Sequence, residues 1–225
     1  MPVFDTIKGA LPMTHKTIQD ALEWRYATKK YDATKKISDA DWTTLRNSLT
    51  LAPSSYGVQP WKFLVIENPD VRKQLKPVSW NQTQVTDASH YVVFLYKEKM
   101  DADFVQKFIN RVAEVRSAPL EALDGYKNML VENLVKAQEE KIRVWSQRQT
   151  YIAMGFLLQT AALLKIDATP MEGFDPVAYD KILGLEGSGW KTVATVALGY
   201  RHQEDALQNQ KKVRFTEDDL IQYIK

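Results

Sequence analysis

Basic residues at the two ends of the sequence are the first candidates for a binding site. Arg25 and Lys29 are four residues apart, so they would share one face if the first helix continued that far. Lys212 and Arg214 form a second cluster near the C-terminus. Fixed cations can hold a phosphate through charge-assisted hydrogen bonds. The alternative for both clusters is a solvated basic surface, which the dipole at a helix C-terminus favours for the first.

A turn-rich segment, APSSYGVQPW at residues 52–61, joins an expected helix to an expected strand. Its hydroxyl groups, at Ser54 and Ser55, and its run of backbone donors suit the edge of a ligand or a phosphate. A plain connecting loop explains the composition equally well. Neither serine lies in a G-x-S-x-G pattern, which argues against a serine hydrolase.

Two later segments could hold a flat heteroaromatic ligand. Asn81 and Gln84 carry amides that both donate and accept hydrogen bonds, as the edge of a heteroaromatic ring requires. Gly173 would let the backbone approach such a ring closely, while Pro170 and Met171 would offer it an apolar face. These residues belong to a turn predicted at 168–175, and a turn with a purely structural role is the alternative.

Other kinds of chemistry are disfavoured by the composition. The sequence has no Cys, and its three His, at positions 15, 90 and 202, are far apart, so we expect no metal site. We interpret His90 as a packed strand residue and not as a catalyst. A net charge of +2 is too small and too evenly spread for a nucleic-acid surface. The glycines at 184, 187 and 189 do not form G-x-G-x-x-G, so a nicotinamide dinucleotide, if used, would visit and leave.

The hydrophobic pattern places these segments on an α+β scaffold. Ser38 followed by Asp41 resembles a capping box, and Pro53 ends the helix that begins there. Residues 146–165 are apolar around most of the helix circumference, which predicts burial, most easily at a subunit interface. The expected helices span 17–27, 38–51, 101–114, 126–145, 146–165 and 177–183, and the expected strands span 61–67, 90–97 and 192–200.

Length and composition indicate one globular domain. With 225 residues, 44% hydrophobic and 26% charged, the chain can fold as a single domain, 1–225, around one core. No apolar run approaches the roughly 20 residues that cross a bilayer. The N-terminal segment also lacks the pattern of a signal peptide. We therefore expect a cytoplasmic protein without membrane contact.

Taken in order, these segments resemble the motifs of the nitroreductase family of FMN enzymes, specifically its bacterial NAD(P)H-dependent nitroreductase and dihydropteridine reductase branch. RYATKKYD resembles the R-x-S-x-K opening, APSSYGVQPW the P-S-S-x-x-x-Q-P-W loop, and NQTQVTDASH the N-x-x-x-x-x-x-A-S-H segment. PMEGFD resembles the P-x-E-G-F-D turn, and KVR the C-terminal K-x-R. The resemblance covers nearly the whole chain, and the order of the motifs makes it specific.

The resemblance implies a nitroreductase-like fold: a mixed, mostly antiparallel sheet of about five strands flanked by helices, in an intertwined homodimer. The C-terminal segment, about residues 203–225, would extend over the partner subunit, and two FMN sites would lie at the interface. The implied activity is hydride transfer by ping-pong kinetics, from NADH or NADPH through tightly bound FMN to nitroaromatics, quinones or similar small acceptors. Reduction of flavins, pteridines or azo compounds, dehalogenation, and flavin binding without turnover are the alternatives.

The resemblance also implies residue roles, with FMN carrying the hydride chemistry and no side chain assigned as catalytic. Arg25, Lys212 and Arg214 would bind the FMN phosphate, and Lys29 the pyrimidine edge of the ring. The ring or ribityl edge would contact Asn81 and Gln84, and the partner subunit would contribute Pro53, Ser54 and Ser55. One ring face would be lined by Pro170, Met171, Glu172 and Gly173, the last two through backbone N–H groups.

Some positions depart from the family pattern. Ala27, also at the cofactor site, stands where the family often has Ser, and Gln84 stands where one branch has Lys. The site therefore has one hydroxyl and one charge fewer than that branch. Gly57 replaces an Asn, and together with Tyr56 and Trp80 it would shape the acceptor pocket.

Overall fold

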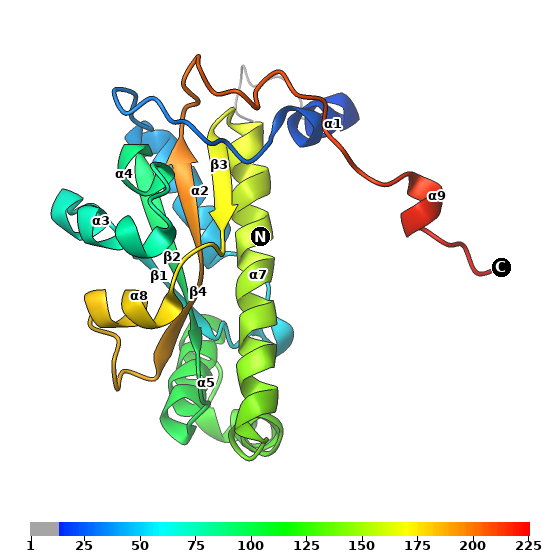
Figure 1. Ribbon diagram of the computed structural model, residues 1–225. Coiled ribbons are helices and arrows are strands. Elements are labelled where there is room, and N and C mark those ends of the chain that lie inside the picture. Colours follow the sequence, from blue (N-terminus) through cyan, green and yellow to red (C-terminus); the bar gives the residue numbers. More distant parts are fainter. Residues whose placement is uncertain (1–13) are drawn as a thin grey trace.

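The computed structural model describes residues 14–225 and has a four-stranded antiparallel sheet at its centre (Figure 1). The strand order is β1-β2-β4-β3, with β1 at Trp61–Val65, β2 at His90–Lys97, β4 at Trp190–Gly199 and β3 at Asp167–Met171. The α+β class is confirmed, with one strand fewer than the five or so expected and no parallel pair in the described part of the chain. The segment after β4 contributes a single bridge, from Arg201 to Tyr31.

The central strand β2 is apolar on both sides because helices cover both faces of the sheet (Figure 1). Val92 and Phe94 belong to one core, which lies under α2 (Asp39–Thr50) and α7 (Glu139–Leu163). Tyr91 and Val93 point to the opposite face, as alternation along a strand requires, and belong to a second core. That second core is covered by α3 (Pro69–Leu75) and α8 (Pro176–Ile182).

Strand β3 replaces part of the turn that the sequence predicted for residues 168–175. It occupies one edge of the sheet, where it pairs only with β4 and Pro170 lies opposite Val196. Proline is tolerated on an edge strand because its missing N–H can face away from the neighbouring strand. The turn itself begins only after Met171.

Helix α7 is continuous from Glu139 to Leu163, so the predicted division between residues 145 and 146 is wrong. The chain breaks earlier, at residues 136–138, after α6 (Asp124–Leu130) and the π-helical turn η4 (Val131–Val135). No proline interrupts α7, so nothing at the predicted boundary stops the helix. Its outer face leaves Ile152 40% and Phe156 46% exposed in this chain. None of the described helices is long and apolar enough to cross a membrane.

The other helices are shorter or lie at the periphery. The capping residue of α2 is Ser38, as predicted, and its Oγ accepts a hydrogen bond from Asp41 N at 3.1 Å. The return bond of the predicted capping box is not made, because Asp41 Oδ2 accepts from Ser38 Oγ at 2.7 Å and not from the Ser38 backbone N–H. The remaining elements are α1 (His15–Trp24), α4 (Gln84–Asp87), α5 (Ala102–Arg116), α9 (Glu217–Leu220), and the 3-10 turns η1 (Ser55–Gly57), η2 (Pro77–Ser79) and η3 (Leu120–Leu123).

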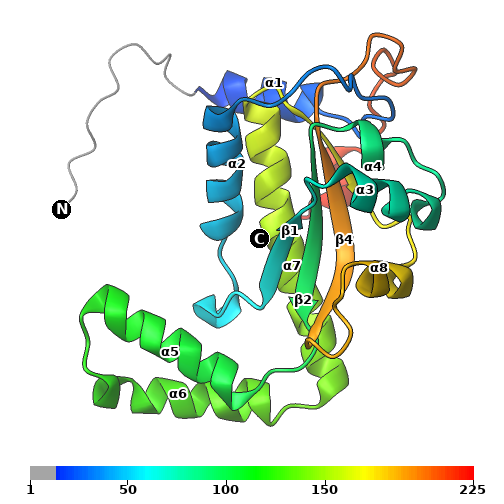
Figure 2. The ribbon, with the colours of Figure 1, turned by 90° about the vertical axis from the view of Figure 1, so that its left-hand side faces the viewer.

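Two parts of the chain project from the sheet and its covering helices. Helices α5 and α6 form an arm beyond one end of the sheet (Figure 2). The C-terminal segment leaves the body near α1 and ends far from it (Figure 1). Along this segment Val213 is 84%, Phe215 78% and Ile224 87% exposed. These apolar side chains belong to none of the cores formed by residues 14–225.

Candidate functional site

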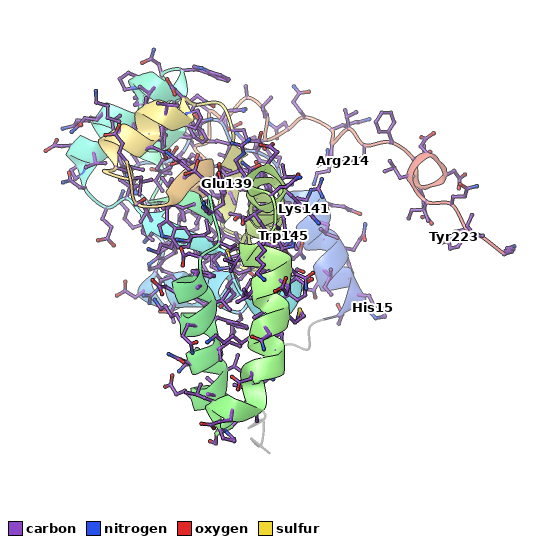
Figure 3. All side chains as sticks on the ribbon, turned by 90° about the horizontal axis from the view of Figure 1, so that it is seen from below. His15, Glu139, Lys141, Trp145, Arg214 and Tyr223 are labelled. Atoms are coloured by element: carbon purple, nitrogen blue, oxygen red, sulfur yellow. The ribbon has the colours of Figure 1, made fainter. Side chains whose placement is uncertain are left out.

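The basic residues from the two ends of the sequence line one pocket. It has a volume of about 370 Å³ and lies between the end of α1 and the C-terminal segment. Figure 3 shows Arg214 of that segment on the side of the molecule where α1 lies. The sequence-predicted residues that line the pocket are Arg25, Ala27, Lys29, Lys212 and Arg214. We call it the cationic pocket.

The charges in the cationic pocket disfavour one another. Burial lowers the pKa of Arg25, and Arg214 lowers it further. Burial also lowers the pKa of Lys212, with Arg25 and Arg214 adding to the effect. Arg25 Nε is buried and has no hydrogen-bond partner within residues 14–225. A buried donor without an acceptor is costly, so the pocket suits an anion with several acceptor oxygens, such as a phosphate.

Arg25 and Lys29 reach this pocket along an extended connection and not along a helix. Helix α1 ends at Trp24, and Arg25 has φ −71° and ψ 139°. The predicted continuation of the helix to Ala27, with a shared helical face for the two cations, is therefore wrong. Lys212 is attached to the same region, because its Nζ donates to the backbone carbonyl of Leu22 in α1.

A buried carboxylate holds the backbone of this extended connection, residues 25–30. Asp205 is 2% exposed and accepts hydrogen bonds from the backbone N–H groups of Lys29 at 2.6 Å and Lys30 at 2.8 Å. Burial opposes ionisation of Asp205, but the backbone donors outweigh it, and the pKa of its carboxyl lies below the usual value. The position of Lys29 is thus fixed through its backbone, while its side chain is exposed.

A second buried carboxylate ties the same connection to the start of β3. Asp167, 3% exposed, accepts hydrogen bonds from Arg201 Nη2 at 2.6 Å and Nε at 3.0 Å, and from Thr28 Oγ1 at 3.1 Å. The Arg201 guanidinium lies 4.3 Å from the Trp24 ring centroid and 4.5 Å from that of Tyr26. Sequence reasoning missed this network, since Asp167 and Arg201 are 34 residues apart and belong to no local motif.

The opposite end of β3 borders an apolar pocket of about 440 Å³. Pro170 and Met171 line it from the strand, and Tyr151 and Met154 line it from α7. Tyr151 OH donates to Glu172 Oε1 at 2.5 Å. Burial raises the pKa of Tyr151, and the hydrogen bond to the Glu172 carboxylate raises it further. This apolar pocket suits the face of a flat ring, with the polar edge of the turn beside it.

The turn after β3 packs against the loop that begins at Trp80. A Cβ on Gly173 would lie 2.5 Å from the Trp80 ring, so a larger residue there would have to displace the ring. Gln82 Nε2 donates to the Gly173 carbonyl at 2.9 Å. Trp80 and Asn81 have φ 54° and 56°, which is uncommon for residues other than glycine. The two segments predicted to hold a ring are thus adjacent, with Asn81 exposed and Gln84 only 4% exposed.

The loop at residues 52–61, which we call the serine loop, lines neither of these two pockets in its own chain. Ser55 N donates to Gln149 Oε1 of α7 at 2.8 Å, which fixes the loop on that helix. Pro53, Ser54 and Ser55 line neither the cationic nor the apolar pocket. Tyr56 lines a third pocket, against α5 and α6. A contact of this loop with the FMN of a partner subunit stays a prediction.

His90 is a packed residue, as the sequence indicated. Its ring stacks on Trp42 with centroids 4.2 Å apart and an interplanar angle of 27°. Its Nδ1 lies 3.1 Å from Ser89 Oγ. Burial lowers the pKa of His90, which favours the neutral ring. In the described part of the chain, no group of three or more His, Asp or Glu side chains is arranged to hold a metal ion.

Comparisons with known proteins indicate the family of the chain. The model of the nitroreductase family matches residues 22–200. A Staphylococcus saprophyticus protein, provisionally named an NAD(P)H nitroreductase, is 37% identical over 217 residues, which cover 93% of this chain and 97% of that protein.

Two solved structures share the fold. A provisionally named nitroreductase from Exiguobacterium sibiricum, in complex with FMN, has a TM-score of 0.73 and 22% identity, with 92% of this chain and 97% of that one covered. A nitroreductase family protein from Streptococcus pneumoniae has a TM-score of 0.75 and 21% identity, with 92% and 99% covered. On the family match and the identity to its bacterial relative, the chain belongs to the nitroreductase family.

Proposed function

We propose that the protein binds FMN and passes hydride from NADH or NADPH to small oxidised acceptors such as nitroaromatics or quinones. One observation carries the proposal: a cationic pocket and an apolar pocket lie at the two ends of β3, a strand that spans roughly 13 Å for its five residues. A ligand with a phosphate at one end and a flat ring at the other matches both. The name of the staphylococcal relative and the FMN bound to the Exiguobacterium protein support this proposal.

The cationic pocket would hold the phosphate. Arg25, Lys212 and Arg214 supply the positive charge that a phosphate dianion needs in a partly dry site. Arg25 Nε, which has no partner within residues 14–225, would gain an acceptor. Bound phosphate would also relieve the repulsion that lowers the pKa of Arg25 and Lys212. Tight binding therefore follows from the site's own charges.

The apolar pocket and the turn beside it would hold the ring. Pro170 and Met171 offer the apolar face, and the backbone N–H groups of Glu172 and Gly173 would face the hydride-accepting edge. FMN, when bound, accepts hydride from the donor and delivers it to the acceptor. Lys29 would lie at the pyrimidine edge, where a cation favours the anionic reduced ring.

Polar side chains would complete the ring's edge. Asn81 is exposed beside the turn and can donate and accept hydrogen bonds there, as can the amide of Gln84. Ala27 would leave its part of the edge without a hydroxyl. Tyr56 and Trp80 would shape the space that donor and acceptor occupy in turn.

We also propose a homodimer in which the FMN sites lie between subunits. The outer face of α7, with Ile152 and Phe156, and the C-terminal apolar residues, with Val213 and Phe215, are exposed in one chain. A partner would cover both faces, and Pro53, Ser54 and Ser55 would then reach the partner's FMN. Light scattering of the purified protein should give twice the chain mass, and a monomer would contradict this part of the proposal.

The function is tested with the visible spectrum of the purified protein reconstituted with FMN. We expect the spectrum of bound flavin. In the absence of oxygen, NADH or NADPH should bleach the flavin absorbance, and a nitroarene or quinone should restore it. Initial rates against both substrates should give parallel double-reciprocal lines, because one ring face serves donor and acceptor in turn. Flavin that binds but is not bleached would identify a non-catalytic binding protein. A panel of flavins, pteridines and azo compounds ranks the acceptors.

A further inference from the structure

A third pocket, of about 310 Å³, lies outside the proposed FMN site. It is formed where the 3-10 turn η1 meets the arm of α5 and α6 (Figure 2). Aromatic side chains from all three elements line it, at Tyr56, Phe108 and Tyr126, together with the guanidinium groups of Arg111 and Arg116. We call it the arm pocket. Its volume lies within the range of small-molecule sites.

The walls of the arm pocket are fixed by contacts between its elements. Tyr126 OH of α6 donates to the Tyr56 carbonyl at 2.6 Å. The rings of Phe108 and Tyr126 are 6.1 Å apart in an edge-on arrangement. Tyr56 and Gly57 both have positive φ, 57° and 68°, and a non-glycine residue held there points to a backbone that its surroundings constrain. The aromatic surface is therefore preformed.

The two arginines give the arm pocket its charge. Arg111 forms an ion pair at 2.8 Å with Glu114, and both side chains are largely exposed. Arg116 occupies the last turn of α5, where the helix dipole favours a cation. Arg116 lines the pocket together with Tyr126, and its charge opposes the rise that burial causes in the pKa of Tyr126. Guanidinium groups bind phosphates in a bidentate manner and stack on aromatic rings.

We infer that the arm pocket binds the adenosine diphosphate end of the nicotinamide donor. The aromatic rings suit the adenine, and the arginines suit the phosphates. The serine loop would connect the FMN site to the arm pocket. Ser55 would contact the FMN of the partner, and the Cα of the next residue, Tyr56, is about 3.8 Å from the Cα of Ser55. A donor whose nicotinamide lies on that ring would therefore extend into the arm pocket. This inference rests on the proposed function.

The test compares donors with and without an adenosine end. The Arg111→Ala/Arg116→Ala double variant, loaded with FMN, is assayed with NADH, NADPH and N-benzyl-1,4-dihydronicotinamide, which lacks adenosine and phosphate. We expect KM to rise about tenfold for NADH and NADPH, as for the loss of a charge-assisted hydrogen bond, with kcat little changed. For the truncated donor, KM and kcat of the double variant should equal those of the unaltered protein. Arg143→Ala is the matched control, since Arg143 also pairs with a glutamate three residues away and does not line this pocket.

Binding of ADP gives a readout that does not depend on turnover. Calorimetry on the FMN-loaded protein should show ADP binding that weakens about tenfold in the double variant and is unchanged in Arg143→Ala. Equal ADP binding in all three proteins would overturn the inference, as would an equal KM change for the truncated donor. If no donor bleaches the flavin, the proposed function fails, yet ADP binding that depends on the two arginines would still support the pocket.

Discussion

The two ends of strand β3 are built by different forces. At the first residue, Asp167, a buried network of charges ties β3 to Arg201 and Thr28. At the other end, two loops approach each other closely, because a Cβ on Gly173 would lie 2.5 Å from the Trp80 ring, which is itself 74% exposed. We call these the charged end and the packed end. The cationic pocket lies at the first and the apolar pocket at the second.

Under the proposed function, the contrast follows from what each end would hold. Cations that repel one another stay together only where the surrounding backbone is anchored, and Asp167 and Asp205 provide that anchor at the charged end. A flat ring needs backbone at close range and an apolar surface, which Gly173 and Met171 provide at the packed end. Charge should therefore govern both stability and phosphate binding at one end, and shape should govern the other.

Breaking the charged end should have the largest effect. Asp167→Ala leaves the Arg201 guanidinium without its carboxylate in a site where Asp167 is 3% exposed. Removing one partner of a buried ion pair costs about 3–5 kcal/mol, so the free energy of unfolding should fall by that amount and FMN should be lost. Urea unfolding followed by fluorescence measures it.

A matched surface pair gives the control for this loss. Asp70 pairs with Lys73 at 2.9 Å, and both side chains are 70% or more exposed. Asp70→Ala should change the free energy of unfolding by less than about 1 kcal/mol. Equal losses in Asp70→Ala and Asp167→Ala would show that the charged end is not held by its buried carboxylate.

Arg25→Ala separates binding from folding at the same end. Under the proposed function it removes a charge-assisted contact to the FMN phosphate, so FMN should bind about 10- to 100-fold more weakly, which corresponds to about 1.5–3 kcal/mol. Without FMN, stability should hold or rise, because Arg25 and Arg214 repel each other. Fluorescence titration of the apoprotein measures FMN affinity. Arg46→Ala is the control, since Arg46 is an exposed arginine of α2 that bonds only Thr43 among the described residues. Unchanged affinity in Arg25→Ala would remove this arginine from the site.

Gly173→Ala tests the packed end. Its new methyl would lie 2.5 Å from the Trp80 ring, which is 74% exposed, so the ring must leave its present rotamer, at a cost of about 0.5–1.5 kcal/mol. Gly125→Ala is the control, because a Cβ at that helical position meets nothing within 4 Å. The second substitution Trp80→Ala should recover most of the loss, and a double-mutant cycle without coupling would contradict the contact.

The sequence predicted the local parts of the fold well. The capping residue Ser38 marked the start of α2, and the apolar run from His90 marked β2, since both signals act over a few residues. Strand β3 was missed because Pro170 reads as a turn residue, and only its place at the sheet edge makes it acceptable. The end of α1 was placed too late for the same kind of reason, since Asp205, far along the chain, holds the extended backbone after Trp24.

For the candidate site, the sequence predicted residues but not the structure that brings them together. The motifs identified Arg25, Lys212 and Arg214, and these line one pocket. The buried carboxylates that position them carry no local pattern, because an isolated Asp looks the same whether it is solvated or paired. The adjacency of Trp80 and Gly173 likewise depends on two loops that the sheet brings together.

The substitution with the smallest expected effect adds a charge near the packed end. Gln84→Lys places an ammonium beside the anionic reduced ring and should raise the flavin reduction potential. The gain is on the order of 1 kcal/mol, equivalent to about 20 mV for a two-electron couple. Spectroelectrochemical titration measures it, with Gln84→Met as an uncharged control of similar length. A fall in the reduction potential, or an equal shift of the potential in both variants, would exclude a charge effect.

The burial of Gln84 makes this shift depend on pH. At 4% exposure, a lysine in its place loses solvation, which lowers the pKa of its ammonium relative to a lysine in water. The ammonium is charged below that pKa, so the rise in potential should be full at low pH and disappear as the pH passes upward through it. In the uncharged Gln84→Met variant, the difference in potential from the unaltered protein should not change with pH. A shift of the same size at every pH would mean that the substitution acts by repacking α4, and the packed end would then be governed by shape alone.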